Sequence, residues 1–135
     1  MRIFSTRHNQ GAFNLAMLIL RLGVGILIIN HGYQKIIHFS AMENSFINFM
    51  GIGSKISLSL VIFAEFFCGI LIAIGLFTRL ACIPILFSMG VAFFKVKQGD
   101  AFGHGEVDVL YIVAFLAIFL AGPGTISGDS LLSRR

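Results

Sequence analysis

The chain of 135 residues has no tryptophan, two prolines and little charge: only 12% of its residues are Asp, Glu, Lys or Arg. An ordinary soluble domain is about 25% charged and about 45–50% apolar. Here 57% of the residues are hydrophobic, and a single core in a chain of this length cannot cover so much apolar surface. The shortage of charge therefore excludes a soluble globular fold and predicts an integral membrane protein whose main partner is membrane lipid.

Cysteine is also scarce. Cys68 and Cys82 form no CxxC motif, so neither a disulfide framework nor a zinc site can be read from them. If the turn between the second and third helices lies near residue 79, their depths differ by about 12 Å at about 1.5 Å of rise per residue. A disulfide needs Cα atoms within about 7 Å. Two buried structural thiols are therefore expected.

Clusters of positive charge are missing as well. The ten Lys and Arg residues are scattered, and the longest run is Arg134-Arg135. Scattered basic residues are typical of charges that flank membrane spans, and they favour that interpretation over a patch that binds nucleic acid. No nucleic-acid partner is expected.

Four apolar stretches predict an all-α fold, an integral membrane four-helix bundle in one domain spanning residues 1–135. The expected helices cover about 13–37, 55–77, 80–96 and 106–122. A span needs about 20 residues, within a range of about 17–25. The first two stretches meet this length easily, whereas the last two lie near its lower limit. Arg21 interrupts the first stretch and no A-x-A-like cleavage site follows, which predicts a retained helix and not a signal peptide.

The connections between these stretches differ in character. Only Thr78 and Arg79 separate the second and third, which predicts a tight antiparallel hairpin. Between the first and second, a Ser40-x-x-Glu43 capping box and helically spaced apolar residues predict a short amphipathic helix at about 40–50, lying in the membrane interface. A mobile loop is the alternative for this segment.

The distribution of Lys and Arg favours one orientation slightly. With four spans both termini share one side, which carries five basic residues against four on the other. Because loops on the cytoplasmic side carry the excess of Lys and Arg, both termini are expected in the cytoplasm.

Arg21 and Glu65 lie inside apolar stretches, where an ionisable side chain costs at least about 2.5–3.5 kcal/mol on insertion scales. If residues 25 and 66 mark the helix midpoints, Arg21 lies about 6 Å inside the midplane and Glu65 almost upon it. This predicts a buried Arg21–Glu65 ion pair. Such a pair would either lock the first two helices together or line a pocket that binds a ligand or relays protons.

A second polar group is expected at the outer end, where His31 and Lys35 approach the end of the first helix. His104, Glu106 and Asp108 open the fourth helix on the same side. Imidazole and carboxylate groups suit a metal ion, but carboxylates in the first turn of a helix are also favoured by the helix dipole. The second interpretation is preferred, so no metal site is predicted. A quinone or anion site that uses these groups remains open.

Three segments resemble a known family when they are taken together in this order. They are LRLGVGILIINHGYQKI (20–36), AEFFCGILIAIGLFTRL (64–80) and GPGTISGDSLL (122–132). They resemble the DoxX family of bacterial membrane proteins, and the resemblance extends over about 13–132. It implies a four-helix bundle in the bacterial cytoplasmic membrane. The polar positions that match are Arg21, His31, Lys35, Glu65 and Arg79.

The function remains open among three classes. The family is similar to the membrane subunit of thiosulfate:quinone oxidoreductase, and some members are associated with quinone or oxidative-stress handling. The preferred hypothesis is a redox-associated subunit that binds a quinone between the first, second and fourth helices, with Arg21, His31 and Glu65 supplying hydrogen bonds or protons. No haem, flavin or iron–sulfur signature is present, so no cofactor other than quinone is evident. A partner redox subunit would then supply the electrons, and the sequence leaves open whether the chain itself is an enzyme.

The alternatives are a small proton-coupled transporter and a non-enzymatic scaffold. In the transporter, Glu65 would be the intramembrane proton site, and a homo-oligomer would be required because four short helices enclose little space. In the scaffold, the buried ion pair would have a structural role alone.

Overall fold

The computed structural model describes residues 9–46, 51–96, 102–103 and 105–133, and helices are the regular secondary structure found in that part of the chain. The all-helical prediction is therefore confirmed for the described residues. The elements are α1 (Gln10–Ile37), α2 (Phe39–Met42), α3 (Ser54–Ile62), the π-helical turn η2 (Phe63–Phe67), α4 (Cys68–Ile74), α5 (Thr78–Val91), the π-helical turn η3 (Ala92–Val96), α6 (Glu106–Ala121) and α7 (Gly128–Ser133).

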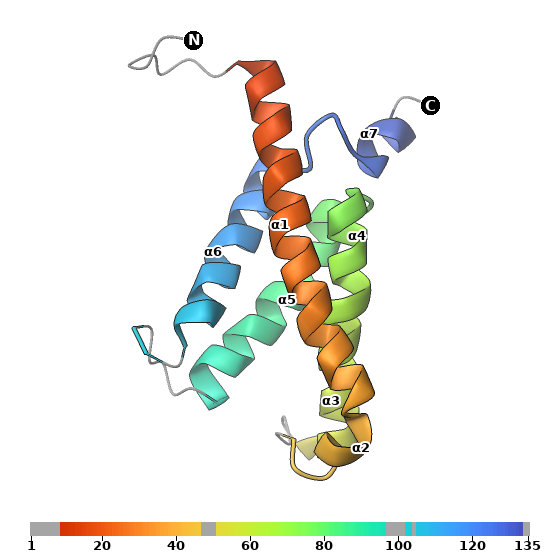
Figure 1. Ribbon diagram of the computed structural model, residues 1–135, viewed down its shortest axis with the longest axis vertical. Helices are drawn as coiled ribbons and strands as arrows, with labels where there is room; N and C mark the ends of the chain where they lie inside the picture. Colours follow the sequence, from red (N-terminus) through yellow and green to blue (C-terminus); the bar gives the residue numbers. More distant parts are fainter. Residues whose placement is uncertain (1–8, 47–50, 97–101, 104, 134–135) are drawn as a thin grey trace.

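Two long rods form one side of the molecule. The first is α1, and the second is the continuous run of α3, η2 and α4 (Figure 1). Among the described residues, these are the two helices long and apolar enough to cross a membrane; α5 is shorter. The helices α5 and α6 lie side by side and form the other half, and the start of α1 lies at the same end of the molecule as α7 (Figure 1).

Local signals explain the ends of the helices. Asn9 begins α1, since its side-chain oxygen accepts hydrogen bonds from the backbone of Gly11 and Ala12 at 2.8 and 3.4 Å. Gly75 ends α4 with φ 75°, in the left-handed region. The chain turns at Gly75–Phe77, so Thr78 and Arg79 are the first residues of α5 and not the connection that the sequence predicted.

This earlier turn corrects the placement of the cysteines. Because the turn is centred on residue 76 and not on residue 79, Cys68 and Cys82 come to similar distances from it, and the two groups interact electrostatically. The predicted difference in depth was wrong. Both side chains are buried and free.

The segment after α1 also differs from the prediction. Helix α2 is four residues long, begins after His38 and has no side-chain cap, so the predicted capping box at Ser40 and Glu43 is wrong. The chain leaves α1 in a new turn already at His38, whose Nδ1 lies 2.8 Å from the Gln34 carbonyl oxygen, and this places Ser40 inside that turn. Residues 47–50 of the predicted interfacial helix lie outside the described residues.

Glycines set the register between α1 and the second rod. A Cβ at Gly32 would lie 2.7 Å from the backbone nitrogen of Phe66, and a Cβ at Gly25 would lie 3.2 Å from the Cβ of Ala73. On the facing helix, a Cβ at Gly69 would lie 2.8 Å from the Cγ2 atom of Ile28. Small residues at membrane helix interfaces permit such close approach of backbones.

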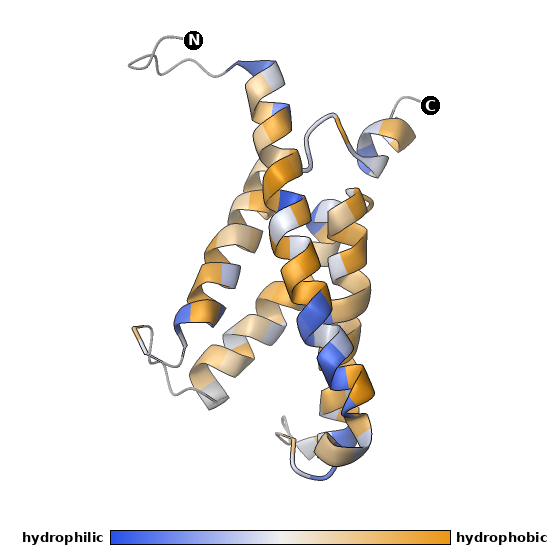
Figure 2. Ribbon diagram, viewed as in Figure 1, coloured by the Kyte–Doolittle hydropathy of each residue, from blue (hydrophilic) through white to orange (hydrophobic). Residues whose placement is uncertain are grey.

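The distribution of polarity is inverted relative to a soluble protein. Large apolar side chains cover the outside, among them Leu120 at 71%, Phe94 at 69% and Leu80 at 67% exposure, while Arg21 and Glu65 are buried at 1% and 3%. Figure 2 shows the apolar colour along most of the length of the long helices, with hydrophilic residues in short stretches between. An exterior of this kind is suited to lipid.

Candidate functional site

A buried ion pair joins the first rod to the second. The Nζ atom of Lys35 donates a hydrogen bond to Oε2 of Glu65 at 2.7 Å, and their side chains are 20% and 4% exposed. Lys35 lies in the last turns of α1, and Glu65 lies at the centre of η2. The partner of Glu65 is therefore Lys35, and the predicted Arg21–Glu65 pair is wrong.

The register of the helices explains this correction. The sequence prediction aligned the midpoints of two apolar stretches, but the contact between Gly32 and Phe66 shifts the alignment by about two turns. The C-terminal half of α1 packs on η2, and its first turns extend past the end of α4 (Figure 1). Arg21 is thus brought opposite Gly75, far from Glu65.

Helix α6 adds buried polar side chains to the ion pair. Asp108 and Tyr111, one turn apart, are 5% and 7% exposed, and Asp108 acts electrostatically on the Glu65 carboxylate. The ring of Tyr111 meets the ring of His31 edge-on, with centroids 5.6 Å apart and planes at 89°. We call His31, Lys35, Glu65, Asp108 and Tyr111 the polar cluster.

The polar cluster reaches the outer surface of the molecule on α1, where Lys35 is partly exposed. His31 is exposed on α1, whereas Glu65 and Asp108 are buried, and His31 also acts electrostatically on Glu65. The cluster therefore links an interior carboxylate to the surface through an imidazole. Such a set of groups can accept, hold and pass protons.

The structure separates the residues that the sequence grouped at the start of the fourth helix. Asp108 belongs to the polar cluster, Glu106 is exposed in the first turn of α6, and His104 lies outside the described residues. Within the described ranges, no three His, Cys, Asp or Glu side chains are placed to hold a metal ion. Tyr111 was missed by sequence reasoning, although its spacing of three from Asp108 and four from Phe115 marks the buried face of α6.

The local geometry around Glu65 is unusual. Residues 63–67 form a π-helical turn, which takes up more residues than an α-helical turn, and isolated π-turns of this kind are frequent at functional sites. Glu65 faces Lys35 across one side of this turn. Its neighbour Ala64 lines a cavity on another side.

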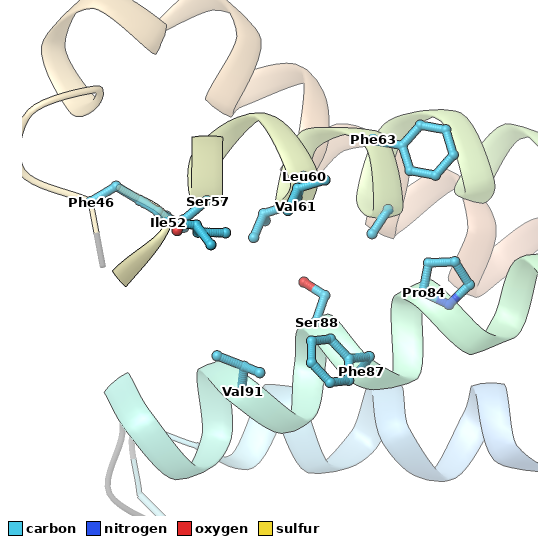
Figure 3. Close-up of a pocket in the computed structure, with 11 residues that line it drawn as sticks. Phe46, Ile52, Ser57, Leu60, Val61, Phe63, Pro84, Phe87, Ser88 and Val91 are labelled. Atoms are coloured by element: carbon cyan, nitrogen blue, oxygen red, sulfur yellow. The ribbon is translucent and has the colours of Figure 1, made fainter. Parts of the chain in front are cut away.

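This cavity lies between the second rod and α5 and has a volume of about 540 Å³. Its walls are almost entirely apolar, and the polar residues among the described ones that line it are Ser57 and Ser88. Figure 3 shows the Ser88 hydroxyl pointing into the space between the helices. The sequence placed a pocket between the first, second and fourth helices; the polar cluster lies there, but this cavity lies between the second and third.

A second set of polar contacts closes the opposite end of the molecule. Nη2 of Arg21 donates to the carbonyl oxygen of Ile126 at 2.6 Å. The Asp129 carboxylate accepts hydrogen bonds from the backbone of Phe77 and Thr78 at 2.7 and 2.9 Å. Arg79 is exposed, with its guanidinium beside Gly122. These contacts attach the C-terminal segment to the α4–α5 turn. Their role is structural.

Comparisons with known proteins agree with a membrane protein. The family model described as DoxX matches residues 16–98. A Bacillus subtilis (strain 168) protein named "Putative oxidoreductase CatD" is 31% identical over 113 residues, which cover 82% of each chain. A Mycobacterium tuberculosis (strain ATCC 25618 / H37Rv) protein named "Uncharacterized membrane protein Rv3486" is 26% identical over 135 residues, covering 89% of this chain and 83% of the other. No solved structure matches the chain.

Proposed function

Because this chain belongs to the DoxX family of membrane proteins, we propose that it is the membrane subunit of a quinone-linked redox system. In this proposal the polar cluster exchanges protons with a membrane quinone. The observation that carries the proposal is the ion pair between Lys35 of α1 and the buried Glu65 at the centre of the second rod, with His31, Asp108 and Tyr111 beside it. The name of the Bacillus subtilis relative, an oxidoreductase, supports the same class.

The chemistry of quinones explains why such a cluster is useful. Reduction of a quinone to a quinol consumes two electrons and two protons, and lipid supplies neither. A carboxylic acid at Glu65 can donate a proton, after which Lys35 stabilises the carboxylate that remains. His31, exposed on α1 beside the ring of Tyr111, can return the proton, since one ring nitrogen of an imidazole can accept a proton while the other donates one. The electrons come from a partner redox subunit.

We further propose that four segments cross the bacterial inner membrane as a multi-pass four-helix bundle, with both termini in the cytoplasm. The segments are α1, the run of α3, η2 and α4, the run of α5 and η3, and α6. At 16 residues, α6 is about 24 Å long, against about 30 Å for the hydrocarbon core. Flanking residues would complete that span. The apolar exterior supports this arrangement.

The test is quinone binding by the purified protein in lipid nanodiscs, measured by titration with decylubiquinone. Wild-type protein should bind, and Glu65→Gln should weaken binding at least about tenfold, as expected for loss of one charged hydrogen-bonding group. Glu106→Gln is the matched control, because it makes the same change at an exposed site of α6. Its affinity should stay within about twofold of wild type.

Two results would contradict the proposal. One is the absence of quinone binding to the wild-type protein, and the other is equal affinity of the Glu65→Gln and Glu106→Gln proteins. Proton-coupled flux of a solute in liposomes, without quinone binding, would instead identify a transporter. If neither activity is found, the buried ion pair has a purely structural role and the chain is a scaffold.

A further inference from the structure

The cavity between the second rod and α5 is separate from the polar cluster and has no role in the proton chemistry above. We infer that it binds the flat ring of a neutral, membrane-dissolved molecule that carries a carbonyl oxygen, and that the Ser88 hydroxyl donates a hydrogen bond to that oxygen. The quinone of the proposed function belongs to this chemical class. The inference concerns the cavity itself, and it can hold or fail separately from the redox proposal.

The size and polarity of the cavity suit a small neutral molecule. Its volume of about 540 Å³ lies within the range of about 300–1,000 Å³ that is usual for small-molecule sites. No charged side chain is found among the described residues that line it. A charged ligand would lose its hydration without gaining a counter-charge, so the occupant must be neutral.

Exposed apolar side chains line the access route to the cavity. Leu60, Phe63 and Phe87 line the cavity and are 55%, 50% and 61% exposed. The mouth of the cavity is therefore surrounded by side chains on the apolar outer surface, where lipid is the solvent in the proposed arrangement. A molecule dissolved in the bilayer can enter from the side without crossing a polar barrier.

The Ser88 hydroxyl is available to an occupant of the cavity. The residue is 8% exposed, its hydroxyl points into the cavity (Figure 3), and it makes no hydrogen bond with any residue in the described ranges. Ser57, by contrast, donates to the Gly53 carbonyl oxygen at 2.7 Å. The Ser88 hydroxyl is open to the cavity and not sealed in the protein interior, and a hydroxyl without a partner is unfavourable in so apolar a space. A carbonyl oxygen on the occupant would remove that penalty, whereas an acyl chain would not.

The backbone hydrogen bonding is irregular on both sides of the cavity. The π-turn η2 contributes Phe63 and Ala64 to one wall, and α5 contributes Pro84 to the other. Proline lacks an amide hydrogen and cannot donate to the carbonyl four residues earlier, so it interrupts the regular helix. A π-turn on one side and a missing backbone hydrogen bond at Pro84 on the other thus line the same cavity. Aromatic rings at Phe63 and Phe87 then offer surfaces for a planar ring.

The experiment uses benzophenone, a neutral diaryl ketone that forms covalent adducts with nearby C–H bonds under ultraviolet light. The wild-type protein in nanodiscs is irradiated with benzophenone, and the labelled peptides are mapped by mass spectrometry. We expect adducts on the residues of the cavity wall, with Val61, Pro84 and Val91 foremost. Excess decylubiquinone should reduce this labelling at least fivefold, and excess dodecane, which has no ring and no carbonyl group, should leave it within twofold.

Two variants and one control separate the contribution of the Ser88 hydroxyl from that of the cavity volume. Ser88→Ala removes the hydroxyl and keeps the space, so labelling should fall about fivefold. Ala64→Leu fills the space, so labelling should fall further. Ser59→Ala is the matched control, because Ser59 is an exposed serine of α3 outside the cavity, and it should label like wild type. Circular dichroism and thermal unfolding of each variant verify that the fold is retained.

The outcomes distinguish this inference from the redox proposal. Equal competition by dodecane and decylubiquinone, or unchanged labelling in Ser88→Ala and Ala64→Leu proteins that retain the fold, would show a lipid-filled groove and overturn the inference. If these two variants bind decylubiquinone normally while Glu65→Gln does not, the ring binds at the polar cluster: the inference fails and the proposed function stands. If benzophenone labels the cavity and decylubiquinone neither competes nor binds, the inference stands and the proposed function fails.

Discussion

Gly32 of α1 lies so close to Phe66 of η2 that a methyl group on Gly32 would come within 2.7 Å of the Phe66 backbone nitrogen. This contact sets the register of the first two rods, and the register decides which charges meet. It brings Lys35 to Glu65 at 2.7 Å and places Arg21 at the other end of the interface. The ion pair is thus a consequence of a close backbone contact one turn away.

We expect Gly32→Ala to destabilise the protein by about 1–3 kcal/mol, because the added methyl group must push the helices apart. Gly23→Ala is the matched control on the same helix. A Cβ at Gly23 meets nothing within 4 Å, so this change should be neutral or stabilising by up to about 1 kcal/mol. Thermal unfolding in detergent measures both. Equal melting temperatures for the two variants would contradict the packing described.

Glu65→Ala should lower stability by about 2–3 kcal/mol, because it leaves the Lys35 ammonium in the interior without its carboxylate. The expected loss lies below the range for fully buried pairs, since Lys35 is 20% exposed. Glu106→Ala, at an exposed site in the first turn of α6, should change stability by less than about 1 kcal/mol. Chemical unfolding in mixed micelles compares the two, and similar losses would show that the buried pair has no stabilising role.

A double-mutant cycle tests which cation is the partner of Glu65. Lys35→Met combined with Glu65→Leu should recover much of the stability lost in either single variant, since no lone charge remains. Arg21→Met combined with Glu65→Leu should give additive losses within about 0.5 kcal/mol, as expected for sites without shared contacts. Strong coupling of Arg21 to Glu65 and none of Lys35 would restore the pairing that the sequence predicted.

The sequence was sufficient to show that both charges within the apolar stretches need partners, but insufficient to pair them. The insertion cost of a side chain depends on its type and its depth, both of which can be estimated from the sequence, so Arg21 and Glu65 could be identified. Pairing depends on register, and the register is determined by side-chain packing at Gly32, which hydropathy does not report. His31, Lys35 and Glu65 were nevertheless all named, because their residue types are rare in lipid.

Long-range contacts limited the prediction in other places. In the sequence, the segment 122–132 contributed only to the family resemblance, and its Asp129 gave no sign that it would bond to the backbone of residues 77 and 78. The cavity beside Ser88 depends on the π-turn at 63–67, for which the sequence carries no recognisable signal. Pro84 in the middle of an apolar stretch was the one feature that could have indicated an opening there.

Asp129→Ala should destabilise the protein by about 2–4 kcal/mol, since two backbone amides of the α4–α5 turn lose a charged acceptor and Arg21 loses a nearby negative charge. Asp129→Asn should lose less, because the amide oxygen can still accept one of the two hydrogen bonds. Ser133→Ala, which removes only the exposed bond from Ser133 to Ser130, is the control and should be near neutral. Limited proteolysis gives a second readout: if Asp129 holds the C-terminal segment on the turn, cleavage after residue 122 should become faster in Asp129→Ala well below its melting temperature. An unchanged cleavage rate together with an unchanged melting temperature would mean that the other contacts of the segment, those of Ile126 with Arg21 and of Thr125 with Asn14 among them, are sufficient to hold it.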